Sequence, residues 1–184
     1  MKIKQQNINK SLLILLSLSF FVRAVLAMIV EFGNDEVYYW TYAMYPDWSH
    51  FDHPPMVGWL IQFFSCNLLF DSEFFLRLSS VVFMSINTYL VFLIGKQVKN
   101  EQTGFYAALL YTASIYAFVI TGIFILPDTP LSIFTLLAIL QFVKYFQYEK
   151  NKHLLLAGLF TGLAMLSKYS GVFVWVGVGL YVII

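Results

Sequence analysis

Long runs of apolar residues recur along the whole 184-residue chain, and they constrain its fold more than any other feature. A helix needs about 20 mostly apolar residues to cross the hydrocarbon core of a bilayer. Six runs approach that length: Ser11–Val30, Leu76–Ile94, Gly104–Leu126, Leu131–Phe146, Leu154–Leu166 and a last run from Gly171. We therefore predict an all-α fold, a polytopic transmembrane helix bundle of about six spans.

Composition excludes the main classes of soluble protein. Hydrophobic residues make up 60% of the chain and charged residues 11%, whereas soluble domains carry about 25% charged residues. This excludes a cytosolic enzyme, a disordered tail and a nucleic-acid-binding module, and the net charge of +1 gives no reason to expect a polyanionic partner. The single cysteine, Cys66, excludes a disulfide framework and a thiolate metal cluster.

The distribution of charge predicts the topology. Most basic residues flank the ends of runs that a zigzag chain brings to one side: Lys2, Lys4, Lys10, Lys96, Lys99, Lys144, Lys150 and Lys152. Most acidic residues lie at the opposite ends: Glu31, Asp35, Glu36, Asp47, Asp52, Asp71, Glu73 and Asp128. By the positive-inside rule we expect a multi-pass protein of the cell membrane, with a cytoplasmic N-terminus and its active site on the outer face.

The two ends of the chain leave two questions of processing open. The first run follows basic residues like a signal peptide, but it contains Arg23 and no clear small-residue cleavage site precedes the loop. We favour an uncleaved first span over a cleaved one. The last run stops at Ile184 without a flanking charge, so we expect residues 1–184 to be the N-terminal part of a larger, truncated domain.

A long outer loop, Glu31 to Phe75, holds most of the polar chemistry. It contains two of the three histidines and three of the four tryptophans. Tyr38, Tyr39 and Tyr42 have helical spacing after a potential cap at Asn34 and Asp35, and a second apolar helix can begin at Pro54. We predict amphipathic helices at the membrane surface that form a structured lid.

Two acidic motifs in this loop are candidates for catalysis or metal binding. Asp35 and Glu36 follow the first span directly, where a general base or metal ligand would reach the aqueous face, although helix capping explains them equally well. Asp52 and His53 precede two prolines that favour extended backbone, and His50 lies three residues earlier. A His-x-x-His pair with an aspartate is a weak signal for a metal site, and hydrogen bonding at the rim is the simpler explanation.

Further charged residues fall near the outer ends of the later runs. Asp128 lies between two prolines, where a turn aspartate is the default explanation. Lys168 interrupts the last two runs and, against the positive-inside trend, falls on the outer side, as a phosphate-binding lysine or a snorkelling one. Arg77 begins the second run and Arg23 lies within the first. Cations facing carboxylates suit an enzyme acting on an anionic lipid.

Four ordered motifs carry a resemblance to a known family. They are Asp35-Glu36, Phe51-Asp-His-Pro-Pro-Met-Val-Gly-Trp-Leu60, Leu126-Pro-Asp-Thr-Pro-Leu131 and Gly162-Leu-Ala-Met-Leu-Ser-Lys-Tyr-Ser-Gly171. With these motifs the chain resembles the N-terminal part of GT-C-type integral membrane glycosyltransferases. The related groups are dolichyl-phosphate-mannose–protein mannosyltransferases, lipid A aminoarabinose transferases and Rgt-type sugar transferases.

The resemblance implies roles for the carboxylates. Asp35, with Glu36 as its neighbour, takes the place of the catalytic carboxylate, and the reaction is an inverting transfer to an acceptor hydroxyl. Asp52 and Asp128 correspond to the positions near a metal ion or phosphate. The resemblance therefore leaves open whether a divalent cation is a cofactor.

The resemblance also implies the donor and the groups that bind it. Family members use a polyprenyl-phosphate-linked sugar from the outer leaflet, so a membrane lipid is an expected partner. Lys168 corresponds to a lysine that stabilises the leaving phosphate, with Arg77 or His53 as additional cations. Aminoarabinose transferases have a lysine where this chain has His53, which puts the role of this position in question.

Two alternatives from other classes stay open. A solute transporter or channel would place charges near the membrane midplane in two related halves, and no such repeat is visible in this sequence. An inactive membrane fragment would keep the spans and lose the acidic motifs, whereas Asp35, Asp52 and Asp128 are all present.

Overall fold

The computed structural model describes residues 5–184, which form an all-α fold, as predicted. Lys2 and Lys4, two of the lysines used to predict the topology, lie outside the described residues. The α-helices are α1 (Gln5–Ile29), α2 (Asn34–Met44), α3 (Met56–Phe64), α4 (Glu73–Val98), α5 (Glu101–Ala113), α6 (Asp128–Tyr148), α7 (Asn151–Ser167) and α8 (Phe173–Ile183). A π-helical turn, Tyr116–Ile120, follows α5, and a 3-10 turn, Tyr169–Val172, precedes α8.

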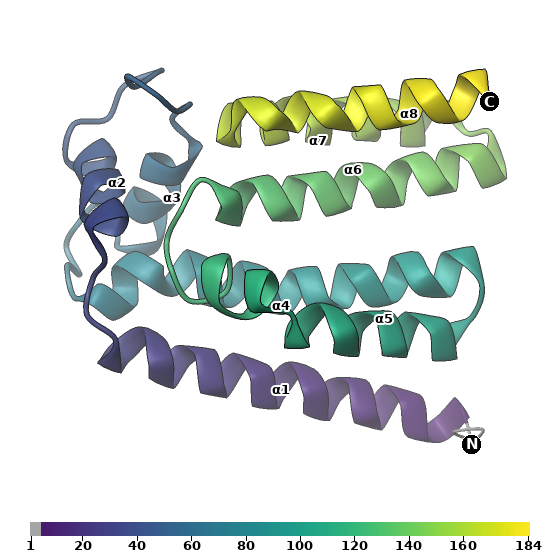
Figure 1. The fold of residues 1–184 in the computed structure, drawn as a ribbon, viewed down its shortest axis with the longest axis horizontal. Helices are drawn as coiled ribbons and strands as arrows, with labels where there is room; N and C mark the ends of the chain where they lie inside the picture. Colours follow the sequence, from purple (N-terminus) through teal and green to yellow (C-terminus); the bar gives the residue numbers. More distant parts are fainter. Residues whose placement is uncertain (1–4) are drawn as a thin grey trace.

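Helix α1 and the helices from α4 to α8 run back and forth in alternating directions (Figure 1). The turns from α4 to α5 and from α6 to α7 lie at one end, which carries Lys10, Lys96, Lys99, Lys144, Lys150 and Lys152 and is called the lysine end below. Helices α2 and α3 lie at the opposite end, called the loop end. The chain therefore has the predicted zigzag connectivity, while the side of the membrane that each end faces stays a prediction.

Three helices have the length and composition to cross a membrane: Asn7–Ile29, Glu73–Val98 and Asp128–Tyr148. Helices α5, α7 and α8 have 13, 17 and 11 residues, fewer than the roughly 20 that a span needs. The predicted continuous run Gly104–Leu126 is wrong as a single helix, because α5 ends at Ala113 and the chain then forms the π-helical turn. Six spans therefore stay a prediction.

Helix α4 forms the centre of the bundle and packs against α1, α5 and α6. Two glycines let α4 and α5 approach closely: a Cβ added to Gly95 would lie 2.7 Å from the Cα of Gly104. A Cβ added to Gly104 would lie 2.4 Å from the carbonyl oxygen of Phe92. Side chains at these positions would force the two helices apart, which explains why glycine stands at both.

The loop end has its own hydrophobic core, so the prediction of a structured outer loop is confirmed. Tyr39 and Tyr42 of α2 pack with Val57 and Ile61 of α3 and with Leu76 of α4. Helix α2 begins at Asn34, so the two residues predicted to cap it lie in its first turn, and α3 begins two residues later than the predicted start at Pro54. The prolines precede α3 rather than opening it, with Pro55 as its N-cap.

Candidate functional site

Asp35 lies in the first turn of α2, with its side chain exposed at the loop end. Within residues 5–184, its carboxylate makes no hydrogen bond and no ion pair. It borders a hollow of about 460 Å³ together with Asn34 and, from the connection between α5 and α6, Ile120 and Phe124. An exposed and unpaired carboxylate beside a hollow can accept a proton from a bound hydroxyl group.

Glu36, the next residue, is buried and forms an ion pair with Arg77 of α4. The Nε of Arg77 donates to Oε1 of Glu36 over 2.7 Å, and its Nη2 donates to Oε2. The carboxylate also accepts hydrogen bonds from the backbone N–H groups of Gly33, at 3.1 Å, and Ile125, at 3.0 Å. Glu36 therefore fastens the start of α2 to α4 and to the segment before α6.

Arg77 uses all five N–H groups of its guanidinium for contacts within the protein. Besides the two bonds to Glu36, Nη1 donates to the carbonyl oxygens of Ala27 and Val30, and Nη2 donates to that of Glu31. Its side chain is 0% exposed. The predicted roles of Glu36 as a catalytic carboxylate and Arg77 as a phosphate ligand do not fit this geometry. The pair instead holds Asp35 in place.

Asp52 is held by two tyrosines that lie one helical turn apart on α2. The hydroxyl groups of Tyr38 and Tyr42 donate to its Oδ1 over 2.9 Å and 2.5 Å. The hydrogen bond from Tyr42 is the largest cause that lowers the pKa of Asp52 below its ordinary value, because it stabilises the ionised carboxylate. The loop that carries Asp52 is therefore anchored on α2.

Both histidines of the outer loop pack against tyrosines of α2. The ring of His50 stacks on that of Tyr42 with 3.6 Å between centroids, and His53 meets Tyr39 edge-on at 5.6 Å. Nδ1 of His53 lies 3.2 Å from Oδ2 of Asp52, without the alignment of a hydrogen bond. The structure thus brings His53 beside Asp52, and its predicted phosphate contact stays a prediction.

Lys168 and Asp128 form an ion pair at the loop end. Lys168 follows α7 and Asp128 begins α6, and 2.9 Å separates Nζ of the lysine from Oδ2 of the aspartate. The hydroxyl group of Tyr116 donates to the other carboxylate oxygen over 3.0 Å. The side chain of Lys168 is 34% exposed, so a polar ligand can reach its ammonium group.

The three predicted aspartates lie around one phenol. Burial is the largest cause that raises the pKa of Tyr39 to about 12, and the carboxylates of Asp52, Asp35 and Asp128 each add to the effect. The geometry agrees: Asp35 lies in the first turn of α2, Asp52 is hydrogen-bonded to two tyrosines of the same helix, and Asp128 begins α6 at the same end of the bundle (Figure 1). The loop end therefore gathers the predicted carboxylates together with Lys168 and His53.

The residues do not fit a complete site for a divalent cation. Among residues 5–184, no group of three His, Cys, Asp or Glu side chains comes together as a set of metal ligands. Oδ1 of Asp52 is already used by Tyr38 and Tyr42, and Asp128 is paired with Lys168. The predicted metal-binding role of Asp52 and Asp128 thus receives no support from this geometry.

Arg23 lies apart from the candidate site, inside α1. Its Nη2 donates to Oγ1 of Thr112 over 2.6 Å, and its guanidinium lies 4.9 Å from the ring centre of Phe118. The side chain is 0% exposed. Arg23 therefore faces protein, as a charge inside a span requires.

Four hydrogen-bond donors that complete the site had no specific signal in the sequence. Tyr38 and Tyr42 were recognised only as residues with helical spacing, and that spacing is the signal that places both hydroxyl groups on one face. Tyr116, the hydrogen-bond donor to Asp128, looked like part of an apolar span. The backbone N–H of Ile125, which donates to Glu36, is visible only in the folded chain.

The chain is similar to known membrane glycosyltransferases. Residues 52–184, more than half of it, match the family described as dolichyl-phosphate-mannose-protein mannosyltransferase. The protein named lipid A galacturonosyltransferase RgtD, from Rhizobium johnstonii, is 27% identical over 145 residues. The match covers 78% of this chain and 30% of that protein, so the chain spans less than a third of its relative. No solved structure matches the chain.

Proposed function

Because the chain belongs to the dolichyl-phosphate-mannose-protein mannosyltransferase family, we propose that it forms part of a membrane glycosyltransferase whose chemistry takes place at the loop end. The donor is a polyprenyl-phosphate-linked sugar, and the acceptor is a hydroxyl group of a lipid, lipopolysaccharide or protein at the outer face. The observation that carries the proposal is the position of Asp35, Asp52, Asp128 and Lys168 at one end of an apolar bundle. The name of the relative, lipid A galacturonosyltransferase, supports a glycolipid acceptor.

Asp35 acts as the general base in this proposal. It takes the proton of the acceptor hydroxyl while the acceptor oxygen forms a bond to the anomeric carbon. The bond between that carbon and the phosphate oxygen breaks, and the lipid phosphate leaves with the electron pair. A single displacement of this kind inverts the anomeric configuration. Exposure, lack of a partner and the adjoining hollow support Asp35 for this role.

Lys168 stabilises the negative charge that develops on the leaving phosphate. Its ammonium group is held by Asp128, which is itself positioned by the hydroxyl group of Tyr116. A fixed cation of this kind stabilises a transition state more than a mobile one, because it needs no reorganisation during the reaction. His53, beside Asp52, is a second candidate for contact with the phosphate.

No step of the proposal passes through a metal ion. The described residues do not form a set of ligands for a metal ion. Adding a chelator to the transfer assay tests directly whether a divalent cation is required. Localisation follows from the predicted topology: the loop end faces outward from the cell membrane and the N-terminus faces the cytoplasm.

The proposal is tested by supplying the protein that carries this chain, in lipid nanodiscs, with a polyprenyl-phosphate sugar and lipid A. We expect sugar transfer with inverted configuration at the anomeric carbon, measured by NMR of the product. A sugar nucleotide of the same sugar is the matched control donor and should give no product. Transfer from the nucleotide alone, or retention of configuration, would refute the proposal.

A further inference from the structure

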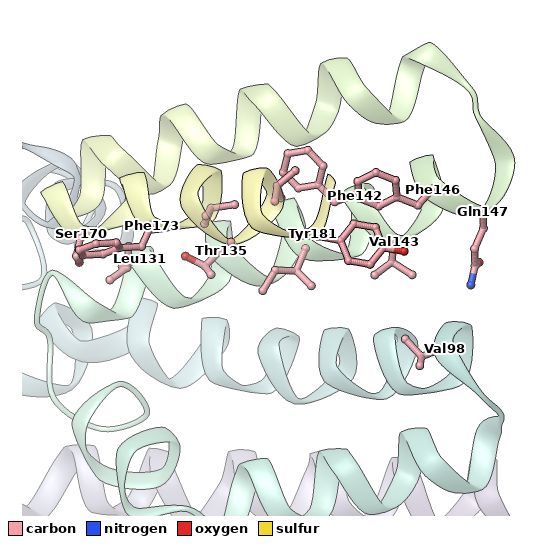
Figure 2. A pocket seen from close by; sticks show the side chains of 14 residues that line it. Val98, Leu131, Thr135, Phe142, Val143, Phe146, Gln147, Ser170, Phe173 and Tyr181 are labelled. Carbon is pink, nitrogen blue, oxygen red and sulfur yellow. The ribbon is translucent and has the colours of Figure 1, made fainter. Parts of the chain in front are cut away.

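A long apolar groove lies between α6 and α8 and runs from Leu131 and Ser170, near the candidate site, to the lysine end. Figure 2 shows Phe142, Phe146 and Tyr181 gathered between the two helices, with Val98 and Gln147 toward the lysine end. Its volume is about 780 Å³. From Leu131 to Gln147 the groove follows α6, which at 1.5 Å per residue corresponds to about 24 Å, most of the depth of a hydrocarbon core.

The two ends of this groove differ in charge. Lys99 directly follows the groove residue Val98, Lys150 lies in the nearby turn between α6 and α7, and Lys152 lies in the first turn of α7. The ammonium groups of these three lysines make no hydrogen bond or ion pair with any other residue of the described chain. At the other end lies the loop end, with its clustered carboxylates. An anionic ligand is therefore attracted to the lysine end and repelled from the loop end.

The mouth of the groove at the lysine end also has a fixed shape. Nε2 of Gln97 donates to Oε1 of Gln147 and, over 2.7 Å, to the hydroxyl group of Tyr148. Nε2 of Gln147 donates to the carbonyl oxygen of Gln97 over 3.0 Å. These bonds join the ends of α4 and α6 and set polar amide groups where an apolar chain would give way to a headgroup.

We propose that this groove is a binding site for an anionic diacyl phospholipid of the leaflet at the lysine end. An acyl chain lies along Phe142, Phe146 and Tyr181, and the phosphate group lies near Lys99 and Lys150. Basic residues beside an opening between membrane helices suit such headgroups. The two glutamates at this end do not cancel the charge: Glu101 is paired with Lys96 at 2.7 Å, and Glu149 is a single negative charge against the positive charges of Lys99, Lys150 and Lys152.

Trp175 provides the probe, because its ring contacts that of the groove residue Phe142 with 5.9 Å between centroids. The 184-residue chain is placed in phosphatidylcholine bilayers that contain a small fraction of brominated phosphatidylglycerol or brominated phosphatidylcholine. The fluorescence lost in the Trp175→Phe variant identifies the contribution of Trp175. We expect brominated phosphatidylglycerol to quench this contribution at least about fivefold more effectively, the factor that one lysine near an anionic lipid supplies.

Two pairs of variants make the test specific. Lys99→Gln with Lys150→Gln should abolish the preference, whereas Lys10→Gln, at the same end but on α1, should keep it. Gly177 lines the groove and Gly179 does not, and a Cβ at either meets nothing within 4 Å. Gly177→Leu should therefore reduce quenching and Gly179→Leu should not.

Three results would overturn the proposal. Equal quenching by the two brominated lipids would show that the groove takes any lipid chain. Quenching by neither lipid, with the chain dimeric in the bilayer, would show that a second copy fills it. Equal effects of Gly177→Leu and Gly179→Leu would show that lipid does not enter the groove. None of these results bears on sugar transfer, which is measured separately.

Discussion

The buried ion pair between Glu36 and Arg77 should contribute more to stability than any other contact at the loop end. Replacing Arg77 by Met keeps an unbranched apolar side chain but leaves the Glu36 carboxylate buried at 2% exposure without its counter-charge. It also removes donors from three backbone carbonyl groups. Breaking a buried pair costs about 3–5 kcal/mol, and we expect a loss of that size in the free energy of unfolding.

Glu73 offers the matched control, because its carboxylate lies 3.9 Å from Nη1 of Arg77 but is 43% exposed. Glu73→Gln should cost less than about 1 kcal/mol. Both variants are compared by reversible unfolding in detergent, followed through the fluorescence of the three tryptophans in the outer loop. If Arg77→Met costs no more than Glu73→Gln, the pair does not hold the loop end together and the reasoning is wrong.

Three further predictions concern the loop end and the helix crossing. Tyr42→Phe removes the main cause that lowers the pKa of Asp52. A carboxylate with a lowered pKa stabilises the fold at a pH above its ordinary pKa of 3.8, and this contribution is lost as the pH falls. Thermal unfolding of the variant should therefore depend less on pH than that of the wild type near and below pH 3.8. Lys168→Gln should slow sugar transfer by about 10²–10³-fold, whereas Lys152→Gln, at the other end, should leave the rate unchanged. Equal transfer rates of the two variants would show that Lys168 does not stabilise the leaving phosphate. Gly104→Ala places a Cβ 2.4 Å from a backbone oxygen of α4 and should cost about 1–3 kcal/mol, measured as a lower unfolding temperature; an unchanged temperature would contradict the close crossing.

Apolar periodicity and lysine placement were enough to predict the helical bundle and its zigzag connectivity. These features depend on local sequence, because an apolar run of sufficient length forms a helix wherever a bilayer is its solvent. The break after α5 was missed for the same reason. Apolar residues continue on both sides of Ser114, so the pattern cannot distinguish a continuous helix from a helix that ends at Ala113.

The candidate site was predicted in part. Asp35, Asp52, Asp128 and Lys168 stood out because charges are rare in so apolar a chain, and the fold brings them to one end. The distinct roles of Asp35 and Glu36 could not be predicted, since they are adjacent and chemically alike.

What separates these two carboxylates is a partner 41 residues away, Arg77, and the helical twist that turns one side chain inward and the other outward. Such pairing depends on tertiary packing, which a local pattern does not contain.

The central claim, that Asp35 is the base for sugar transfer, is tested most directly by the single-turnover rate of Asp35→Asn. The matched control is Asp47→Asn: Asp47 is an exposed aspartate of the same loop, and within residues 5–184 its carboxylate accepts a hydrogen bond only from the backbone N–H of Trp48. Loss of a general base should slow transfer by about 10²–10⁴-fold, while the control keeps the wild-type rate and both variants keep the wild-type unfolding temperature. A wild-type transfer rate in Asp35→Asn would contradict the account.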